Sequence, residues 1–286
     1  MTYVRNDGLT GYDFSYAKKG MAVRLAYLLF AIFYFILFKV GRTSAGAIIL
    51  CYHAVTLQQC EKFARQMRHI SSRAVGLDDI TQNRFADGAV SVTFDDAFEC
   101  LISTAVPITK NIEVPIAIFA VTENMGKPPQ WGMDEYRSDT SEMIMTEEQL
   151  QALDKEKYCL IGSHTVNHRK LAELSENDVQ YELQSSKNFL EKLLGHPIKH
   201  LALPHGSFTY QVIKLAQDIG YNGILTLEEK SIDAGLPDNS LGRFSVSPDM
   251  WMIEFVLTAN GSYAWLYRWR KLIRRARLLL RGVNHG

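Results

Sequence analysis

From Ala47 onward, short apolar runs alternate with longer amphipathic stretches, and this alternation constrains the fold more than any other feature of the chain. Strands that alternate with helices form parallel βαβ units, and about six or seven such units favour a barrel over an open sheet. We expect buried strands in the apolar runs at residues 47–55, 89–96, 114–122, 158–164, 200–206 and 222–227.

Amphipathic segments between these runs predict helices at residues 146–155, 175–194 and 208–219. Two of them begin with capping signals. Ser175 precedes Asp178 by three residues, and Thr146 precedes Gln149 by the same interval, as in a capping box. The sequence therefore predicts an α/β fold whose helices have defined starts.

The N-terminal part of the chain differs in composition from the region after Ala47. Residues 1–20 form a mixed extension, and residues 25–38 are an unbroken apolar run flanked by Arg24 and Lys39. The run is shorter than the roughly 20 residues that cross a bilayer, although residues 21–40 together could just span one. Since the run has no polar face, we expect residues 21–46 to contain a membrane-associating helix and a linker. A buried core helix is the alternative interpretation.

The C-terminal part, residues 251–286, is expected to be a helical segment. Seven of the 31 basic residues fall between Arg268 and Arg281, and on a helical wheel most of the apolar residues of this stretch share the opposite arc. A basic amphipathic helix with tryptophans is typical of an element that lies on an anionic membrane surface. The alternative is a helix packed on the barrel with a solvated basic face.

Composition excludes few classes of protein. The formal net charge is zero, from 31 basic and 31 acidic residues, so the chain has no global attraction to nucleic acid. The four cysteines, Cys51, Cys60, Cys100 and Cys159, form no CxxC pair and match no disulfide or zinc-ribbon spacing. This pattern suits a reducing compartment without requiring one.

Polar side chains that can do chemistry stand at the ends of three predicted strands. Asp95 and Asp96 close the strand at 89–96. Active sites in parallel α/β folds collect at these carboxyl ends. Two adjacent carboxylates repel each other unless a cation or proton intervenes. In a strand they would face opposite ways, so a turn at this point must aim both at one site. A solvated turn would also explain an isolated pair of aspartates.

His164 and His168 follow the strand at 158–164 and are four residues apart. On a helical turn they would share a face and could bind one metal ion. Two imidazoles and one carboxylate leave coordination positions open for water and substrate. The glutamate of a metalloprotease HExxH helix is absent, because Thr165 stands in its place. A general base must therefore come from elsewhere, and the aspartate not used as a ligand is the obvious candidate.

The third segment is Pro204-His205-Gly206, which turns out of the strand at 200–206. A turn of this type can present a backbone N–H to a developing oxyanion. Taken alone it is only a turn.

Together these segments resemble the polysaccharide deacetylases of carbohydrate esterase family 4, the NodB-homology domain. TFDD at 93–96 resembles the family's first motif, and SHTVNH at 163–168 resembles the second. LALPHG at 201–206 is similar to the third motif in its Pro-x-Gly variant, and SLGRFSV at 240–246 resembles the arginine-containing strand that closes the domain. The resemblance covers residues 47–250 and implies a distorted (β/α) barrel.

The resemblance also implies roles for individual residues. Asp95 would be the general base, and Asp96, His164 and His168 would hold one divalent ion, most simply zinc, with cobalt, nickel or manganese as alternatives. The backbone N–H of His205, within Pro204–Gly206, would bind the oxyanion. The chemistry implied is hydrolysis of an N-acetyl group, or less often an O-acetyl group, on a sugar.

The chain departs from the family pattern in three respects. Ala97 replaces the usual glycine after the two aspartates, and His205 stands where tyrosine is more common. The family's C-terminal Leu-x-His, the source of its general acid, has no counterpart. We expect His53 to supply the acid, because it ends the first strand and a barrel would point it into the same mouth.

These inferences predict a metal-dependent hydrolase that removes an N-acetyl group from an acetamido sugar. The ends of the chain favour a lipid-linked or nascent cell-surface glycan as the substrate, at the bacterial inner membrane with the cytoplasmic side preferred over the periplasmic. The alternatives are a catalytically silent glycan-binding barrel and a deformylase acting on a lipid-linked sugar. The partners expected are the sugar and a membrane lipid surface, with no nucleic acid; the sequence does not indicate an oligomeric state.

Overall fold

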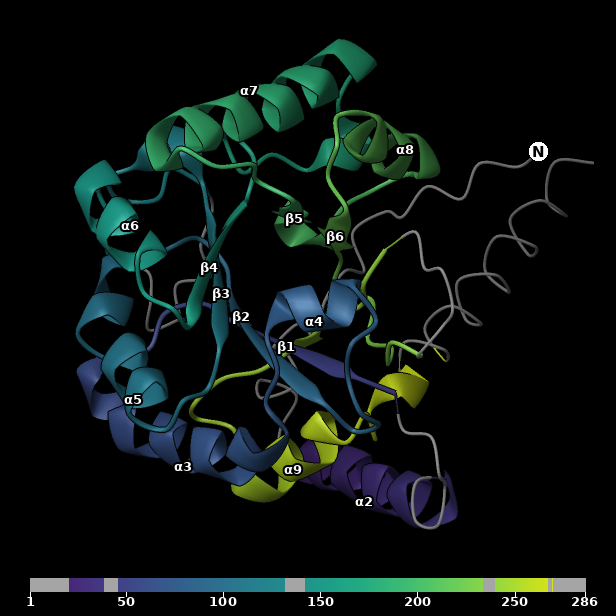
Figure 1. Ribbon diagram of the computed structural model, residues 1–286. Helices are drawn as coiled ribbons and strands as arrows, with labels where there is room; N and C mark the ends of the chain where they lie inside the picture. Colours follow the sequence, from purple (N-terminus) through teal and green to yellow (C-terminus); the bar gives the residue numbers. More distant parts are fainter. Residues whose placement is uncertain (1–20, 39–45, 132–141, 234–239, 267–268, 270–286) are drawn as a thin grey trace, which may run out of the picture.

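The computed structural model describes residues 21–38, 46–131, 142–233, 240–266 and 269 (Figure 1). The predicted extension at 1–20 and most of the predicted basic helix lie outside these residues. The order of the described elements confirms the alternation of strands and helices that the sequence predicts.

A seven-stranded parallel sheet forms the centre of the described structure, in the order β6-β5-β4-β3-β2-β1-β7. An isolated bridge from Leu225 to Leu241 links the end of β6 to the segment before β7, so the curled sheet nearly closes. This is the distorted barrel predicted from the sequence. Its strands are β1 (Ile48–Tyr52), β2 (Val90–Phe94), β3 (Ile116–Ala120), β4 (Cys159–Ser163), β5 (His200–Ala202), β6 (Gly223–Leu225) and β7 (Phe244–Ser245).

Except for the short helix at Leu77–Thr81, the helices surround the outer face of this sheet, as Figure 1 shows. The three predicted helices are confirmed as α6, α7 and α8, and both predicted caps are present. The Ser175 hydroxyl accepts from the Asp178 N–H, and Thr146 and Gln149 form a reciprocal capping box. The helices are α2 (Met21–Phe38), α3 (Cys60–Ile70), α4 (Leu77–Thr81), α5 (Ala105–Asn111), α6 (Glu147–Asp154), α7 (Glu176–Leu194), α8 (Tyr210–Asp218) and α9 (Met252–Ala259).

Successive side chains along each strand point to opposite faces of the sheet, so the hydrophobic core consists of two clusters. On β1, Leu50 belongs to the large cluster beneath the outer helices, whereas Ile49 belongs to a smaller cluster inside the curled sheet. Leu77 and Ile80 of α4 join the inner cluster. Cys51 points to the same face of β1 as Ile49. The inner face can therefore carry polar side chains beyond the end of the inner apolar cluster.

Helix α2 packs on the domain beside α9. Leu28 and Ala31 are buried, and Arg24 forms an ion pair with the fully buried Glu254, with 2.8 Å between Nε and Oε1. The Arg24 guanidinium also lies 3.7 Å from the centre of the Trp251 ring. The opposite side of α2 exposes large apolar side chains, among them Leu29 and Phe33.

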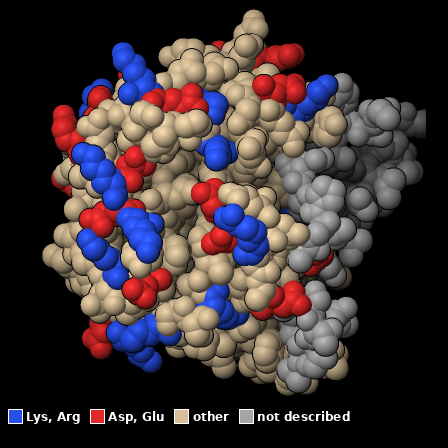
Figure 2. Space-filling view, in the orientation of Figure 1, with Lys and Arg blue, Asp and Glu red and all other residues tan. Residues whose placement is uncertain are grey.

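Among the helices in the described ranges, none has the length and apolar content needed to cross a membrane. Figure 2 shows that acidic and basic side chains intermingle over the face of the molecule seen in Figure 1.

Candidate metal centre

Asp95 and Asp96 lie directly after β2, and both side chains are buried. The Asp95 N–H donates to the Tyr52 carbonyl at 2.9 Å, which continues the ladder to β1. The chain then turns through two left-handed residues, Asp96 with φ 70° and Ala97 with φ 54°. This turn gives the two consecutive carboxylates access to the same site, as the sequence requires, and places Ala97 in a conformation that favours glycine.

His164 follows β4 and is positioned by two hydrogen bonds. Its N–H donates to the Ala120 carbonyl, and its Nδ1 lies 2.8 Å from the Ala202 carbonyl oxygen. Since a carbonyl can only accept, Nδ1 carries the hydrogen and Nε2 keeps its lone pair. Nε2 is the nitrogen that faces Asp96.

The segment from His164 to His168 is a loop and not the helical turn that we expected from the spacing. Thr165 with φ 69° and His168 with φ 56° are left-handed, and they bring the two imidazole rings to 4.9 Å between centroids. The spacing of four residues was thus the right signal for a shared site, although a different backbone conformation produces it.

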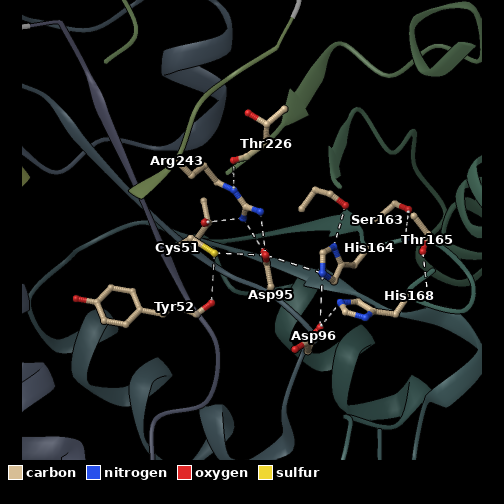
Figure 3. Close-up of polar contacts among 12 residues, drawn as sticks. Cys51, Tyr52, Asp95, Asp96, Ser163, His164, Thr165, His168, Thr226 and Arg243 are labelled. Atoms are coloured by element: carbon tan, nitrogen blue, oxygen red, sulfur yellow. Dashed lines mark hydrogen bonds and ion pairs between the residues drawn. The ribbon is translucent and has the colours of Figure 1, made fainter. Parts of the chain in front are cut away.

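Asp96, His164 and His168 form one cluster of potential metal ligands (Figure 3). The Asp96 Oδ1 lies 3.5 Å from the His164 Nε2 and 3.4 Å from the His168 Nε2. Atoms that bind a tetrahedral ion at about 2.0–2.2 Å lie roughly 3.3–3.6 Å from one another. These donors therefore fit one divalent ion and leave a coordination position for another ligand.

Burial favours the neutral state of the imidazoles in this cluster. It lowers the pKa of His164, and it lowers the pKa of His168 well below its ordinary value, with the neighbouring His164 and His205 adding to the effect. Neutral imidazole is the form that binds metal.

Asp95 does not belong to this cluster, because Arg243 binds it from the other side. The guanidinium makes a bidentate contact, with NH1 2.6 Å from Oδ1 and NH2 2.8 Å from Oδ2. The Cys51 thiol donates to Oδ2 at 3.3 Å. Burial alone would raise the pKa of Asp95, but Arg243 lowers it well below its ordinary value, so the carboxylate stays ionised.

The remaining predicted site residues lie around this centre. Half-buried His53 follows β1, close enough for its charge to influence the pKa of both Asp95 and His168. In the turn Pro204–Gly206, the Gly206 N–H donates to Leu203, whereas the His205 N–H takes no part in that bond. The His205 ring lies 4.5 Å from the His168 ring, and burial lowers its pKa to about 4.

Sequence reasoning missed three features of the site. The Cys51 thiol contacts Asp95, a contact that its position in an apolar run does not indicate. Trp131 stacks on His168 with 4.3 Å between ring centroids. The motif at 240–246 marked the segment that contains Arg243 but gave no sign of which carboxylate it binds.

His200 is a further buried histidine of the described structure. It opens β5 and is buried, with its Nε2 3.4 Å from the Thr81 hydroxyl oxygen.

Fold and site together define a class: a (β/α) barrel with a candidate mononuclear Asp-His-His metal centre at the carboxyl ends of its strands. A family model described as polysaccharide deacetylase matches residues 82–224, half of the chain. The chain belongs to the polysaccharide deacetylase family.

Curated relatives agree with this assignment. A poly-beta-1,6-N-acetyl-D-glucosamine N-deacetylase of Staphylococcus aureus strain MSSA476 is 25% identical over 169 residues, which are 59% of this chain and 58% of that protein. YxkH of Bacillus subtilis strain 168 is 24% identical over 165 residues, 58% of this chain and 54% of that protein. The chain thus spans little more than half the length of these relatives.

Solved structures show the same fold. IcaB from Ammonifex degensii aligns with a TM-score of 0.63 at 21% identity, over 75% of this chain and 97% of that one. The deacetylase PplD of Streptococcus pyogenes, in complex with acetate, aligns with a TM-score of 0.62 at 22% identity, over 76% of this chain and 99% of that one.

Proposed function

We propose that this protein is a metal-dependent N-deacetylase that hydrolyses the acetamido group of a sugar. The observation that carries the proposal is the buried cluster of Asp96, His164 and His168 beside the ionised carboxylate of Asp95. A divalent ion held by the cluster would polarise the acetyl carbonyl and acidify the attacking water. Zinc suits these ligands best, and cobalt, nickel or manganese can take its place.

The protein's own groups would handle the protons. Asp95 accepts a proton from water as the water oxygen bonds to the acetyl carbon. Arg243 keeps Asp95 ionised, which makes it a weak base that is always in the basic form. The His205 N–H donates to the developing oxyanion. The carbon–nitrogen bond then breaks, and His53 protonates the departing nitrogen, which leaves acetate and an amino sugar.

The substrate class follows from the family and from the named relatives. Two lines support an acetamido-sugar glycan: the deacetylase family model and the Staphylococcus aureus protein named for a polymer of N-acetylglucosamine. We propose that the substrate is a lipid-linked or nascent cell-surface glycan.

The proposed location is a membrane surface, the cytoplasmic side of a bacterial inner membrane. Two observations support it. The outer side of α2 exposes apolar residues, and the chain beyond Trp269 carries a concentration of arginine and lysine. Exposed apolar area and a concentration of basic residues suit a surface of anionic lipids.

Acetate release tests the activity. Purified protein is incubated with free, polymeric and lipid-linked acetamido sugars, with and without a chelator, and acetate and formate are measured. We expect acetate, lost on chelation and restored by zinc. Asp95→Asn should retain the metal and lose at least about a hundredfold of the rate, the usual scale for a general base. Formate as the product would identify a deformylase, and no product from any acetamido sugar would favour a silent glycan-binding barrel.

A further inference from the structure

Glu182 of α7 is a fully buried carboxylate, and its hydrogen bonds go to the loop between the two candidate metal ligands. Its Oε2 accepts from the Val166 N–H at 3.0 Å and from the Asn167 N–H at 2.8 Å. Its Oε1 accepts from the Asn167 side-chain amide at 3.0 Å. Three donors satisfy this charge, and all three belong to residues that lie between His164 and His168.

The loop needs such support because its backbone is strained. Thr165 and His168 both occupy the left-handed region, which costs a residue other than glycine about 1 kcal/mol or more. Consecutive backbone N–H groups that point to one side form a concave anion site. In this protein, the Glu182 carboxylate fills that site from α7.

A second contact ties the same helix face to the same segment. Ser186 lies one turn after Glu182, and its hydroxyl is 2.8 Å from the Ser163 hydroxyl. The Ser163 hydroxyl also accepts from the Thr165 N–H at 3.2 Å. Helix α7 therefore fixes the chain immediately before His164 and midway between the two histidines.

We propose that Glu182 is a positioning residue for the metal centre, and that it sets metal affinity by holding His164 and His168 at the separation that one ion requires. The proposal rests on the proposed metal site. Charge matters as well as shape, because hydrogen bonds to a carboxylate are stronger than those to a neutral amide. Loss of such supporting contacts typically weakens metal binding about 10- to 100-fold.

The test is metal binding by the full-length protein, measured separately from activity. Zinc affinity is measured by competition with a chromophoric chelator, and the visible spectrum of the cobalt-loaded protein reports ligand geometry. We expect Glu182→Gln to raise the zinc dissociation constant about 10-fold or more and to shift the cobalt bands. Glu176→Gln, which neutralises an exposed carboxylate on the same helix, should change neither.

Variants of Asn167 test the same proposal if Glu182→Gln fails to fold, because Asn167 is exposed and tolerates replacement more readily. Asn167→Asp keeps the shape but places a carboxylate against Glu182, so zinc affinity should fall about 10-fold or more. Asn167→Ala removes a single hydrogen bond and should cost about fivefold. Asn188→Asp, the same change at an exposed position farther along α7, should have no effect.

The outcomes separate this role from the proposed function. Folded Glu182→Gln or Asn167→Asp with wild-type zinc affinity and an unchanged cobalt spectrum would overturn the role of Glu182 and leave the metal site intact. A wild-type protein that binds neither zinc nor cobalt would overturn the metal site and this role together. Normal metal binding without acetate release would contradict only the proposed activity.

Discussion

Asp95 keeps its negative charge in the protein interior because Arg243, also fully buried, makes a bidentate contact with it. Either charge alone would be costly there, since a buried ion that loses its partner destabilises a protein by about 3–5 kcal/mol. The pair also gives Asp95 a cation as its partner, while its Oδ2 stays 3.8 Å from the Nε2 of His164. The two carboxylates differ in role because their surroundings differ.

Replacing Arg243 should therefore reduce stability sharply. We expect Arg243→Met to lower the free energy of unfolding by about 3–5 kcal/mol, measured by urea denaturation with a chelator present. Arg243→Met combined with Asp95→Asn should recover much of the loss, because no isolated charge remains. A double variant as unstable as the sum of the two single variants would contradict this coupling.

His200 predicts a dependence of stability on pH. Burial lowers its pKa to about 4, against an ordinary value of 6.5. The unfolded chain takes up the proton first, so this contribution to stability is present above pH 6.5 and is lost as the pH falls from 6.5 to 4. This shift in the pKa of His200 corresponds to a loss of at most about 3 kcal/mol in the free energy of unfolding. Urea denaturation at pH 7.5 and pH 5, with a chelator present, should show a smaller decrease for His200→Gln than for wild type. Equal decreases would show that His200 does not contribute.

Prediction from sequence succeeded at single residues where the signal was local. Asp96, His164 and His168 do converge, because each stands at the carboxyl end of its strand or in the loop that follows. Arg243 and Glu182 could not be assigned in the same way. Arg243 lies 148 positions from its partner, and Glu182 occupies a helix in which a buried glutamate has the same sequence appearance as a solvated one.

Among the secondary-structure elements, α2 shows how an apolar helix is attached to a polar domain. Its charged residue Arg24 is mostly buried and paired with Glu254 of α9, beneath the ring of Trp251. Sequence analysis offered a membrane helix and a core helix as alternatives. The structure shows that one side of α2 packs on the domain while the other side remains exposed.

Loss of Arg24 should loosen α2. We expect Arg24→Met to leave Glu254 buried without its cation and to destabilise the contact between α2 and α9 by about 3 kcal/mol. Hydrogen exchange of α2 amides should accelerate while that of β2 and β3 stays unchanged, because a local contact governs local opening. Arg65→Met, at an exposed position of α3, is the control. Unchanged exchange in α2 would show that apolar packing alone holds the helix.

The strands were predictable from their apolar runs, and helices α6, α7 and α8 from their amphipathic patterns, two of them with capping residues. The short helices were not. Helices α4 and α5 have only 5 and 7 residues, too few to show a helical period, and their existence depends on packing against the sheet. The left-handed loop at His164–His168 was missed for a related reason, since Glu182 stabilises it from a distant helix.

At the scale of the whole molecule, the number and order of strands were sufficient to predict a curled parallel sheet. This topology gathers the ends of β1, β2, β4 and β5 at one mouth, so residues from His53 to His205 can share a site. The bridge from Leu225 to Leu241, which nearly closes the sheet, is a contact between neighbouring segments that the apolar pattern alone does not reveal.

The exposed side of α2 and the basic C-terminal segment make the proposed membrane contact testable. Flotation with vesicles should show binding to phosphatidylglycerol-containing membranes that weakens with salt, since charge attraction is screened. Leu29→Glu with Phe33→Glu, at positions 66% and 56% exposed, should weaken binding about tenfold or more. Leu57→Glu with Tyr210→Glu, at positions 73% and 70% exposed elsewhere on the surface, should not. Replacing Arg274, Arg275 and Arg277 with glutamate should remove the preference for anionic lipid. Each basic residue near such a surface contributes about 1 kcal/mol to the free energy of binding. Equal flotation of all these variants would exclude α2 and the basic segment as the membrane contact.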